Sequence, residues 1–178
     1  MGIPVLIATC TADGDGYCQF LSGIDSTYDE YMFVCTDINP VTDNTHFQFQ
    51  VNVAGQSGFN ETITSTFFSD YHNEANNSAG ITYHADYDQA QGTEYQALSR
   101  EIGNGADEST AGILHLFAPS NTTYTTQFYS RFSGYVHDDG AKGGYMSGYF
   151  NVTGAVDEVS FAMSAGAMDG VVQMYGIK

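Results

Sequence analysis

Three groups of acidic and histidine residues contain the types of side chain that could bind a metal ion. The first is Asp13 and Asp15 in the segment ADGDG, which resembles the start of an EF-hand calcium loop. Such a loop requires Asp or Asn at its fifth position and a carboxylate at its twelfth. Tyr17 and Ile24 occupy those positions here. We therefore predict that ADGDG forms a hairpin turn instead of a calcium site.

The other two groups match no defined metal-binding loop. They consist of His84, Asp86, Asp88 and Glu94, and of His137, Asp138 and Asp139. The first of them could gather oxygen atoms around Ca²⁺, whereas the second lies in YVHDDG, which is typical of a solvated turn. No metal-binding residue and no cofactor is assigned to any of the three groups.

The sequence contains none of the common catalytic signatures. G-x-S-x-G, H-E-x-x-H and the P-loop are all absent. Composition alone leaves open a pair of glycosidase carboxylates, but the acids lie mainly in turns and the chain has no Trp to bind a sugar ring. His46, His72 and His115 are scattered, and His115 lies inside an apolar segment. We expect a protein without catalytic residues that is not an enzyme.

The net charge of the chain limits the classes of partner that we expect. It has 4 Lys and Arg against 21 Asp and Glu, a net charge of −17. Such a surface repels phosphate backbones and anionic lipid, so we expect neither a nucleic-acid nor a membrane partner. Charged residues make up only 14% of the chain, while Tyr is abundant. Tyr-rich surfaces of low charge favour protein interfaces and glycan contacts.

The three cysteines, Cys10, Cys18 and Cys35, have no metal-binding or redox spacing. An odd number does not make a disulfide framework, so we expect buried thiols in a reducing cytosol, with a Cys10–Cys18 hairpin bridge as the alternative. The first residues lack the basic region of a signal peptide, and no apolar run reaches membrane-spanning length. Both observations agree with synthesis in a cytoplasm.

Short extended segments separated by turns predict an all-β fold. In residues 45–53, Phe47, Phe49, Val51 and Val53 alternate with His46, Gln48, Gln50 and Asn52, which predicts a half-buried strand with the apolar set inward. In residues 26–38 we place Tyr31, Phe33 and Cys35 inward. About ten such segments, with Gly-rich turns between them, favour a jelly-roll-like antiparallel β-sandwich. No linker divides residues 1–178, so we expect a single domain.

Three local expectations follow from the same pattern. Residues 3–10 and 17–21 should pair as a hairpin across ADGDG, and residues 71–92 should form a long polar loop. Residues 158–163 and 171–177 should form a terminal hairpin. The apolar residues of VVQMYGI occupy both parities, which is typical of a strand in the middle of a sheet.

Four segments resemble a group of uncharacterised proteins encoded by tailed phages of marine bacteria, of the cyanophage and pelagiphage type. They are SGIDSTYDEYMFVCTDINPVTDNTHFQFQ, FFSDYHNEA, YQALSREIGNGADESTAGILHLFAPSNTTYTTQFYS and GYFNVTGAVDEVSFAMSAGAMDGVVQMYGIK. The resemblance extends over nearly the whole chain from about Leu6. It implies a virion-associated structural protein that is assembled in the host cytoplasm, and it carries over no catalytic residue.

Two functions fit these expectations. The favoured one is a capsid decoration or cement protein on the particle exterior, oligomeric, with the major capsid protein or tail proteins as partners. The alternative is a tail-fibre or receptor-binding module in which residues 71–92 contact a cell-surface glycan, with Ca²⁺ as a further contact. A glycan-active enzyme is a third hypothesis, which would need two carboxylates facing each other across a cleft.

Overall fold

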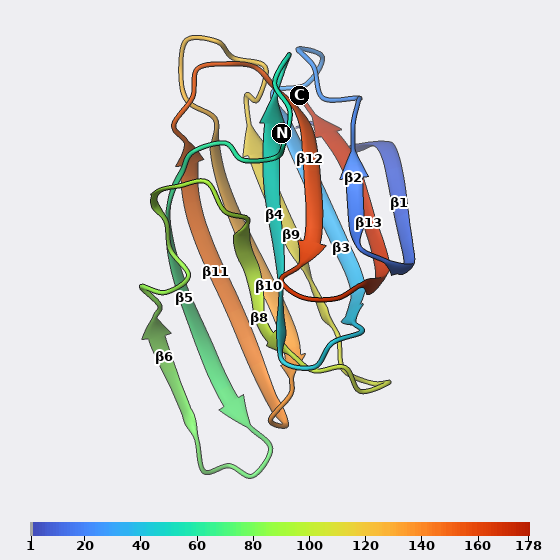
Figure 1. Ribbon diagram of the computed structural model, residues 1–178, viewed down its shortest axis with the longest axis vertical. Coiled ribbons are helices and arrows are strands. Elements are labelled where there is room, and N and C mark those ends of the chain that lie inside the picture. The colour runs from blue at the N-terminus through green and yellow to red at the C-terminus, as the bar shows by residue number, and fades with distance from the viewer. Residues whose placement is uncertain (1) are drawn as a thin grey trace.

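The computed structural model describes residues 2–178, and all of its regular elements are β-strands that pair in antiparallel fashion. They form two stacked sheets (Figure 1). The larger sheet has the order β1-β13-β3-β9-β10-β11-β5, with β6 and β7 both paired to β5. The smaller has the order β2-β12-β4-β8. A single residue pair, Val136 with Ile102, joins the two sheets between β10 and β8.

The strands of the larger sheet are β1 (Val5–Asp15), β3 (Glu30–Pro40), β5 (Ile63–Asn73), β6 (Ala79–Tyr83), β7 (Ala90–Gly92), β9 (Thr110–Phe117), β10 (Gln127–Val136), β11 (Gly140–Phe150) and β13 (Met168–Ile177). Those of the smaller sheet are β2 (Tyr17–Phe20), β4 (Thr45–Val53), β8 (Gln96–Ile102) and β12 (Val156–Met163).

The connectivity is that of a jelly roll. Strands β1, β13, β3 and β9 form one layer and β2, β12, β4 and β8 form the other, so the chain alternates between layers as two Greek keys do. The hairpin β10–β11 and the strands β5 to β7 extend the larger sheet beyond this unit. The predicted all-β sandwich is confirmed, with thirteen strands where about ten were expected.

The core lies between the sheets and is built from aromatic rings. Phe161 on β12 is fully buried, and its ring lies 5.4–6.4 Å from those of Phe20, Phe33, Phe47 and Phe49. The inward sets predicted for residues 26–38 and 45–53 are confirmed, because every member is buried. Period-two alternation identified them correctly since each strand packs one face on the opposite sheet.

Gln50 and Asn52 correct the outward half of that prediction. Both were expected to face solvent, yet they are 0% and 4% exposed. Loops cover this end of β4: the Gln50 side-chain amide donates to the carbonyl oxygens of Glu61 (2.9 Å) and Thr93 (3.2 Å). The hydrogen bonds satisfy the polar groups that burial removes from water. Polar residues at alternate positions of this strand therefore did not indicate a solvent-exposed face.

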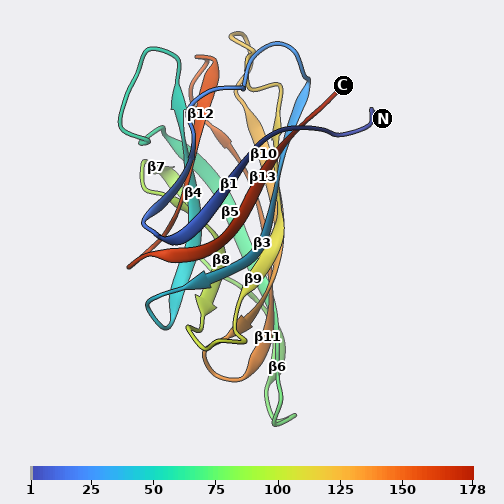
Figure 2. The same ribbon diagram turned by 90° about the vertical axis from the view of Figure 1, so that its right-hand side faces the viewer.

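The two predicted hairpins, one near each end of the chain, are both wrong, because the two strands of each lie in different sheets. The strand β13 does lie in the middle of a sheet, between β1 and β3, as expected. However, β12 pairs with β4 and β2 in the other sheet. The strands β1 and β2 are likewise split between the sheets, while β1 and β13 run side by side (Figure 2). Short Gly-rich connections cross between the layers as readily as they close hairpins.

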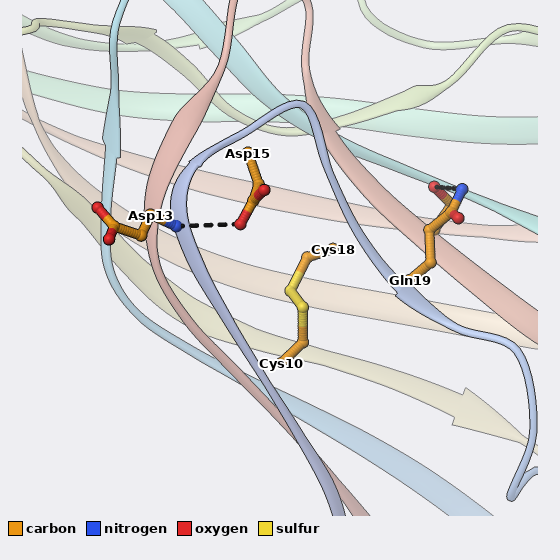
Figure 3. The surroundings of a disulfide bond; sticks show 6 residues. Cys10, Asp13, Asp15, Cys18 and Gln19 are labelled. Atoms are coloured by element: carbon orange, nitrogen blue, oxygen red, sulfur yellow. Dashed lines mark hydrogen bonds between the residues drawn. A yellow bond between two sulfur atoms is a disulfide. The ribbon is translucent and has the colours of Figure 1, made fainter.

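The cysteines also correct the sequence-based expectation. Cys10 on β1 and Cys18 on β2 form a disulfide bond, shown in Figure 3, and Cys35 alone is a free, buried thiol. The preferred expectation of three reduced cysteines is therefore wrong, and its alternative is right about the pair. The bond joins the edge strands of the two sheets; it does not close a hairpin ladder.

The segment 71–92 is not a long loop. The strand β5 continues to Asn73, and β6 returns along it with the register Tyr83–Phe68 to Ala79–His72. This β5–β6 hairpin extends past the smaller sheet at one end of the molecule (Figure 1). The polar residues on both sides of AGITY misled the prediction, because a strand of five residues is too short for its alternation to be recognised between them.

Candidate interaction surfaces

The three groups of possible metal ligands do not form metal sites. Within residues 2–178, no three His, Cys, Asp or Glu side chains are arranged to hold an ion. Asp13 and Asp15 lie at the end of β1, where the Asp15 carboxylate accepts from the Asp13 amide at 3.2 Å. The neighbouring Gly14 amide donates to Asp169 at 2.7 Å. The predicted hairpin turn at ADGDG is therefore wrong: Ala12 to Asp15 belong to β1 and pair with β13, and only Gly16 separates β1 from β2 in the other sheet.

The residues of the second group point to different partners. His84 Nε2 lies 2.7 Å from the Ser69 hydroxyl, Asp88 accepts a hydrogen bond from the Tyr83 hydroxyl, and Glu94 accepts one at its main-chain carbonyl from Gln89. Their oxygen atoms therefore do not converge around a common centre.

In the third group, Asp138 accepts from the Tyr71 hydroxyl at 3.0 Å and Asp139 from the Tyr135 hydroxyl at 3.4 Å. The His137 backbone amide donates to the Glu101 carbonyl at 3.1 Å.

A polar pocket nevertheless brings one residue of each of the last two groups together. Its volume is about 260 Å³, and its lining includes Ser69, Tyr71, Thr82, His84, Asp138 and Lys142. It lies on the inner side of the larger sheet, where the β5–β6 hairpin and β11 extend past the smaller sheet. Hydroxyl, imidazole, carboxylate and ammonium groups in one pocket can exchange hydrogen bonds with a polyhydroxylated ligand.

Two of the four basic residues of the chain meet at Glu101, and one of them, Lys142, lines this pocket. Arg100 and Lys142 both form ion pairs with Glu101, and the Arg100 guanidinium stacks 3.7 Å from the centre of the Tyr87 ring. Arg100 is only 7% exposed, and its Nε and Nη1 atoms have no hydrogen-bond partner within residues 2–178. The bulge at Glu101, whose φ is 56°, turns its carboxylate between the two cations.

Two histidines near these cations, His46 and His84, have lowered pKa values. Burial and then the charge of Arg100 lower the pKa of His46, and the same two causes lower that of His84. His46 Nδ1 accepts from the Glu101 amide and its Nε2 lies 3.1 Å from the Tyr87 hydroxyl. Both rings are therefore held neutral near pH 7 as structural hydrogen-bonding groups.

The outer face of the larger sheet is an uncovered aromatic and aliphatic surface. We define the outer face by the side chains that point away from the smaller sheet on β3, β9, β10, β11, β5 and β6. They include Met32, Val34, Ile113, His115, Phe117, Tyr129, Arg131, Tyr145, Phe68 and Tyr83. Phe68, Tyr129 and Tyr83 are 42%, 45% and 57% exposed.

The rings of the outer face stack on one another from strand to strand. His115 and Tyr129 lie 4.6 Å apart with planes at 15°, and Phe68 and Tyr145 lie 4.9 Å apart at 7°. Neighbouring rings that stack along the strand-to-strand direction stand upright, so they present edges, not flat faces, to solvent. At these two ring pairs the flat faces are therefore occupied by the neighbouring rings.

Arg131 lies near the middle of the outer face. It is exposed, it lies opposite Ile113 and Tyr145 on the neighbouring strands, and its guanidinium is 5.5 Å from the Tyr145 ring centre. It takes part in none of the ion pairs within residues 2–178. His115 lies two residues beyond Ile113 on β9, opposite Tyr129, and pairs with Glu30. The sequence analysis did not predict this surface. The available signal was that His115 and Phe117 alternate with Leu114 and Leu116, so the two pairs must lie on opposite faces of the sheet.

Comparisons with known proteins identify no family. No protein-family model and no curated protein matches the chain. A solved structure that matches it is a structural-genomics protein of unknown function from Bacteroides ovatus, with 5% identity and a TM-score of 0.33. The match covers 59% of this chain and 45% of that one, so the chain spans less than half of its length. Residues 2–178 contain no helix that could cross a membrane.

Proposed function

We propose that the protein is a non-enzymatic virion structural protein of the capsid decoration or cement type, located on the particle exterior and assembled in the host cytoplasm. Its partners are other virion proteins, either the major capsid protein or tail proteins, and other copies of itself. The resemblance to marine phage proteins motivates the location. The outer face of the larger sheet is the observation that carries the assembly role.

The composition of the outer face supports a protein partner. Tyr, Phe, Met and Arg are the residues that protein interfaces favour, and charge is depleted at interface centres. In a chain with a net charge of −17, the central exposed charge of this face is the cation Arg131. An acidic residue on the partner would pair with it. A lattice of identical contacts then multiplies a modest affinity per subunit.

The test is the number of copies per particle, measured by quantitative mass spectrometry of purified virions against the major capsid protein. A number close to that of the capsid protein supports decoration, and a few copies indicate a tail location. Complete absence of the protein from virions contradicts the proposal.

A second measurement tests the surface itself. Phe68→Ser and Arg131→Ser alter the outer face and should reduce retention of the protein on particles lacking it by about tenfold, as loss of an interface anchor does. Tyr124→Ser is the matched control, because Tyr124 is 73% exposed and lies in the connection before β10. Equal retention of all three variants would show that another surface binds the particle.

A second candidate function is glycan binding by a tail-fibre or receptor-binding module. The polar pocket at the β5–β6 hairpin favours it, because Thr82, His84, Asp138 and Lys142 offer both donors and acceptors to sugar hydroxyls. Glycan-array binding that Asp138→Asn abolishes and Asp88→Asn preserves would support this function. Binding lost with EDTA would add the Ca²⁺ contact, and no binding to any host envelope glycan would count against it.

A further inference from the structure

The strand β6 is an exposed and uncharged edge of the larger sheet. It runs from Ala79 to Tyr83 with the sequence AGITY, and it pairs with β5 alone. All five of its residues are exposed, Ile81 to 77% and Tyr83 to 57%. Figure 1 shows it at the opposite side of the sheet from β1. One side of its backbone is thus available to another strand.

The register identifies which backbone groups face outward. The His84 amide donates to the Phe67 carbonyl at 2.9 Å, and the Ser78 carbonyl accepts from the Asn73 amide at 3.1 Å. Since hydrogen-bonded and non-hydrogen-bonded pairs alternate along an antiparallel ladder, the even-numbered residues of β6 bond to β5. The amides and carbonyls of Ala79, Ile81 and Tyr83 therefore point away from the protein.

The edge strands β1, β2 and β7 carry features that discourage pairing, and β6 does not. The strand β1 follows Pro4, has an irregular register between Leu6 and Ala8, and is tied to β2 by the disulfide bond. The strands β2 and β7 have four and three residues. Bulges, prolines, charges and short length are the usual protection of an edge. The register of β6 with β5 is regular and its sequence has neither Pro nor charge.

We propose that β6 pairs with β6 of a second copy of this chain, in antiparallel orientation about a two-fold axis that passes through Ile81. Ile81 then lies opposite Ile81 of the second copy, and Ala79 lies opposite Tyr83. All three residues are of the outward-bonding parity, so the pairs close about six main-chain hydrogen bonds. The small Ala79 side chain leaves room for the large Tyr83 ring on the same face.

The pairing extends the larger sheet, and with it the outer face, across both copies. It rests on the oligomeric part of the proposed function but not on the virion location, because the edge geometry is a property of the isolated chain. A two-fold contact is self-complementary and closes at the dimer, so it leaves the outer face of both copies open to the particle.

Charge gives the dimer a recognisable salt dependence. Asp70 lies opposite Ile81 on β5, and both copies carry a net charge of −17. Like charges repel across the two-fold axis, and added salt screens that repulsion. We therefore expect the dissociation constant to fall as ionic strength rises, which is the opposite of an interface held by ion pairs.

Sedimentation velocity over micromolar to millimolar concentrations tests the proposal. The wild type should form dimers, and Ile81→Pro should raise the dissociation constant by about tenfold or more, since it removes the two central hydrogen bonds. Proline is tolerated where the amide faces solvent at an edge. Ile81→Lys is the second variant, and Leu6→Lys, on the edge strand β1, is the matched control that should leave the dimer unchanged.

A cross-linking measurement tests the register. Ile81→Cys places two thiols opposite each other at a Cα separation suited to a disulfide bond, so mild oxidation should convert most of the protein into covalent dimers. Leu6→Cys should cross-link far less. A protein that stays monomeric throughout, or a dimer that persists in both Ile81 variants, would overturn the proposal. A dimer lost in Phe68→Ser but kept in Ile81→Lys would place the second copy on the outer face, which also overturns it.

The two proposals fail separately. The virion measurement counts copies on a particle, and the sedimentation measurement uses the isolated protein. A dimer in solution with no virion copies would contradict only the proposed location, whereas a particle-bound protein that remains monomeric would contradict only the β6 contact.

Discussion

Cys10 on β1 and Cys18 on β2 form a disulfide bond with their Cα atoms 5.9 Å apart. The bond joins the edge strand of one sheet to the edge strand of the other. The chain between them turns the corner of the sandwich (Figure 3). The bond therefore fixes the crossing point at which β1 passes into β2. A short closed loop of this kind restricts the unfolded chain and stabilises the folded state.

Reduction should lower the free energy of unfolding by about 2–3 kcal/mol, the effect expected for closing a loop of this length. Urea unfolding with and without dithiothreitol measures the difference. The control is the double variant Cys10→Ala, Cys18→Ala, whose stability should be the same in both conditions. A wild type unaffected by reductant would contradict a disulfide bond that stabilises the fold.

Cys35 should be chemically inert in the native protein. It is 1% exposed on β3, and burial raises the pKa of its thiol well above the usual value, so little thiolate is available to react. Thiol titration should detect no reactive cysteine in the native protein and one after denaturation. Three thiols should appear only when reductant is added; three without it would show that Cys10 and Cys18 are reduced.

The same titration bears on where the protein matures. Structural disulfides do not persist in a reducing cytosol, so a protein assembled there would carry Cys10 and Cys18 as thiols. They would oxidise after release from the cell. Particles taken from intact host cells and denatured in the presence of a thiol-blocking reagent should therefore contain three blocked cysteines per chain, and released particles treated in the same way should contain one.

Phe161 should be the most sensitive position of the core. Its ring packs against four other phenylalanines from both sheets. Phe161→Ala should cost about 3–5 kcal/mol of unfolding free energy, because it removes buried surface and leaves a cavity. Tyr124→Ala, at a position 73% exposed, should change it by less than about 0.5 kcal/mol. Chemical denaturation of both variants checks the ranking; comparable losses would contradict the assignment of the core.

The fold class could be predicted from the sequence because the buried residues of the core strands recur at every second position. Phe47 and Phe49 alternate with polar neighbours, and both contact Phe161 in the middle of the sandwich. The partner of each strand was less predictable. A Gly- and Asp-rich segment such as ADGDG is compatible with a hairpin turn or with the end of a strand that crosses to the other sheet. Only the pairing of β1 with β13 and of β2 with β12 decides between them.

The candidate surfaces were hidden from the sequence for a different reason. Tyr145 and Phe68 are far apart in the chain and become neighbours only through the pairing of β11 with β5. His84 and Asp138 were each noticed in a polar segment, but their shared pocket depends on where the β5–β6 hairpin and the β10–β11 turn meet. The spacing of residues along the chain can reveal a set of side chains within one loop. It cannot reveal a set that the pairing of distant strands brings together.

The stability of the protein should fall on mild acidification through His46 and His84. Burial and the charge of Arg100 lower both pKa values in the folded state, whereas the unfolded residues titrate near pH 6.5. Above that pH both states are neutral at these rings. As the pH drops through about 6.5 the unfolded state binds protons first, so the free energy of unfolding decreases until the folded pKa is passed.

Urea unfolding at a series of pH values measures this slope, and His46→Gln and His84→Gln should each make it shallower. His72→Gln is the matched control, because His72 is exposed on β5 and its ring lies within hydrogen-bonding distance of the nearby Asn76 side chain. Arg100→Gln should also flatten the slope, since it removes a positive charge that opposes protonation of both rings. If His46→Gln and His84→Gln kept the wild-type slope, acid sensitivity would have to come from the carboxylates and not from this cluster.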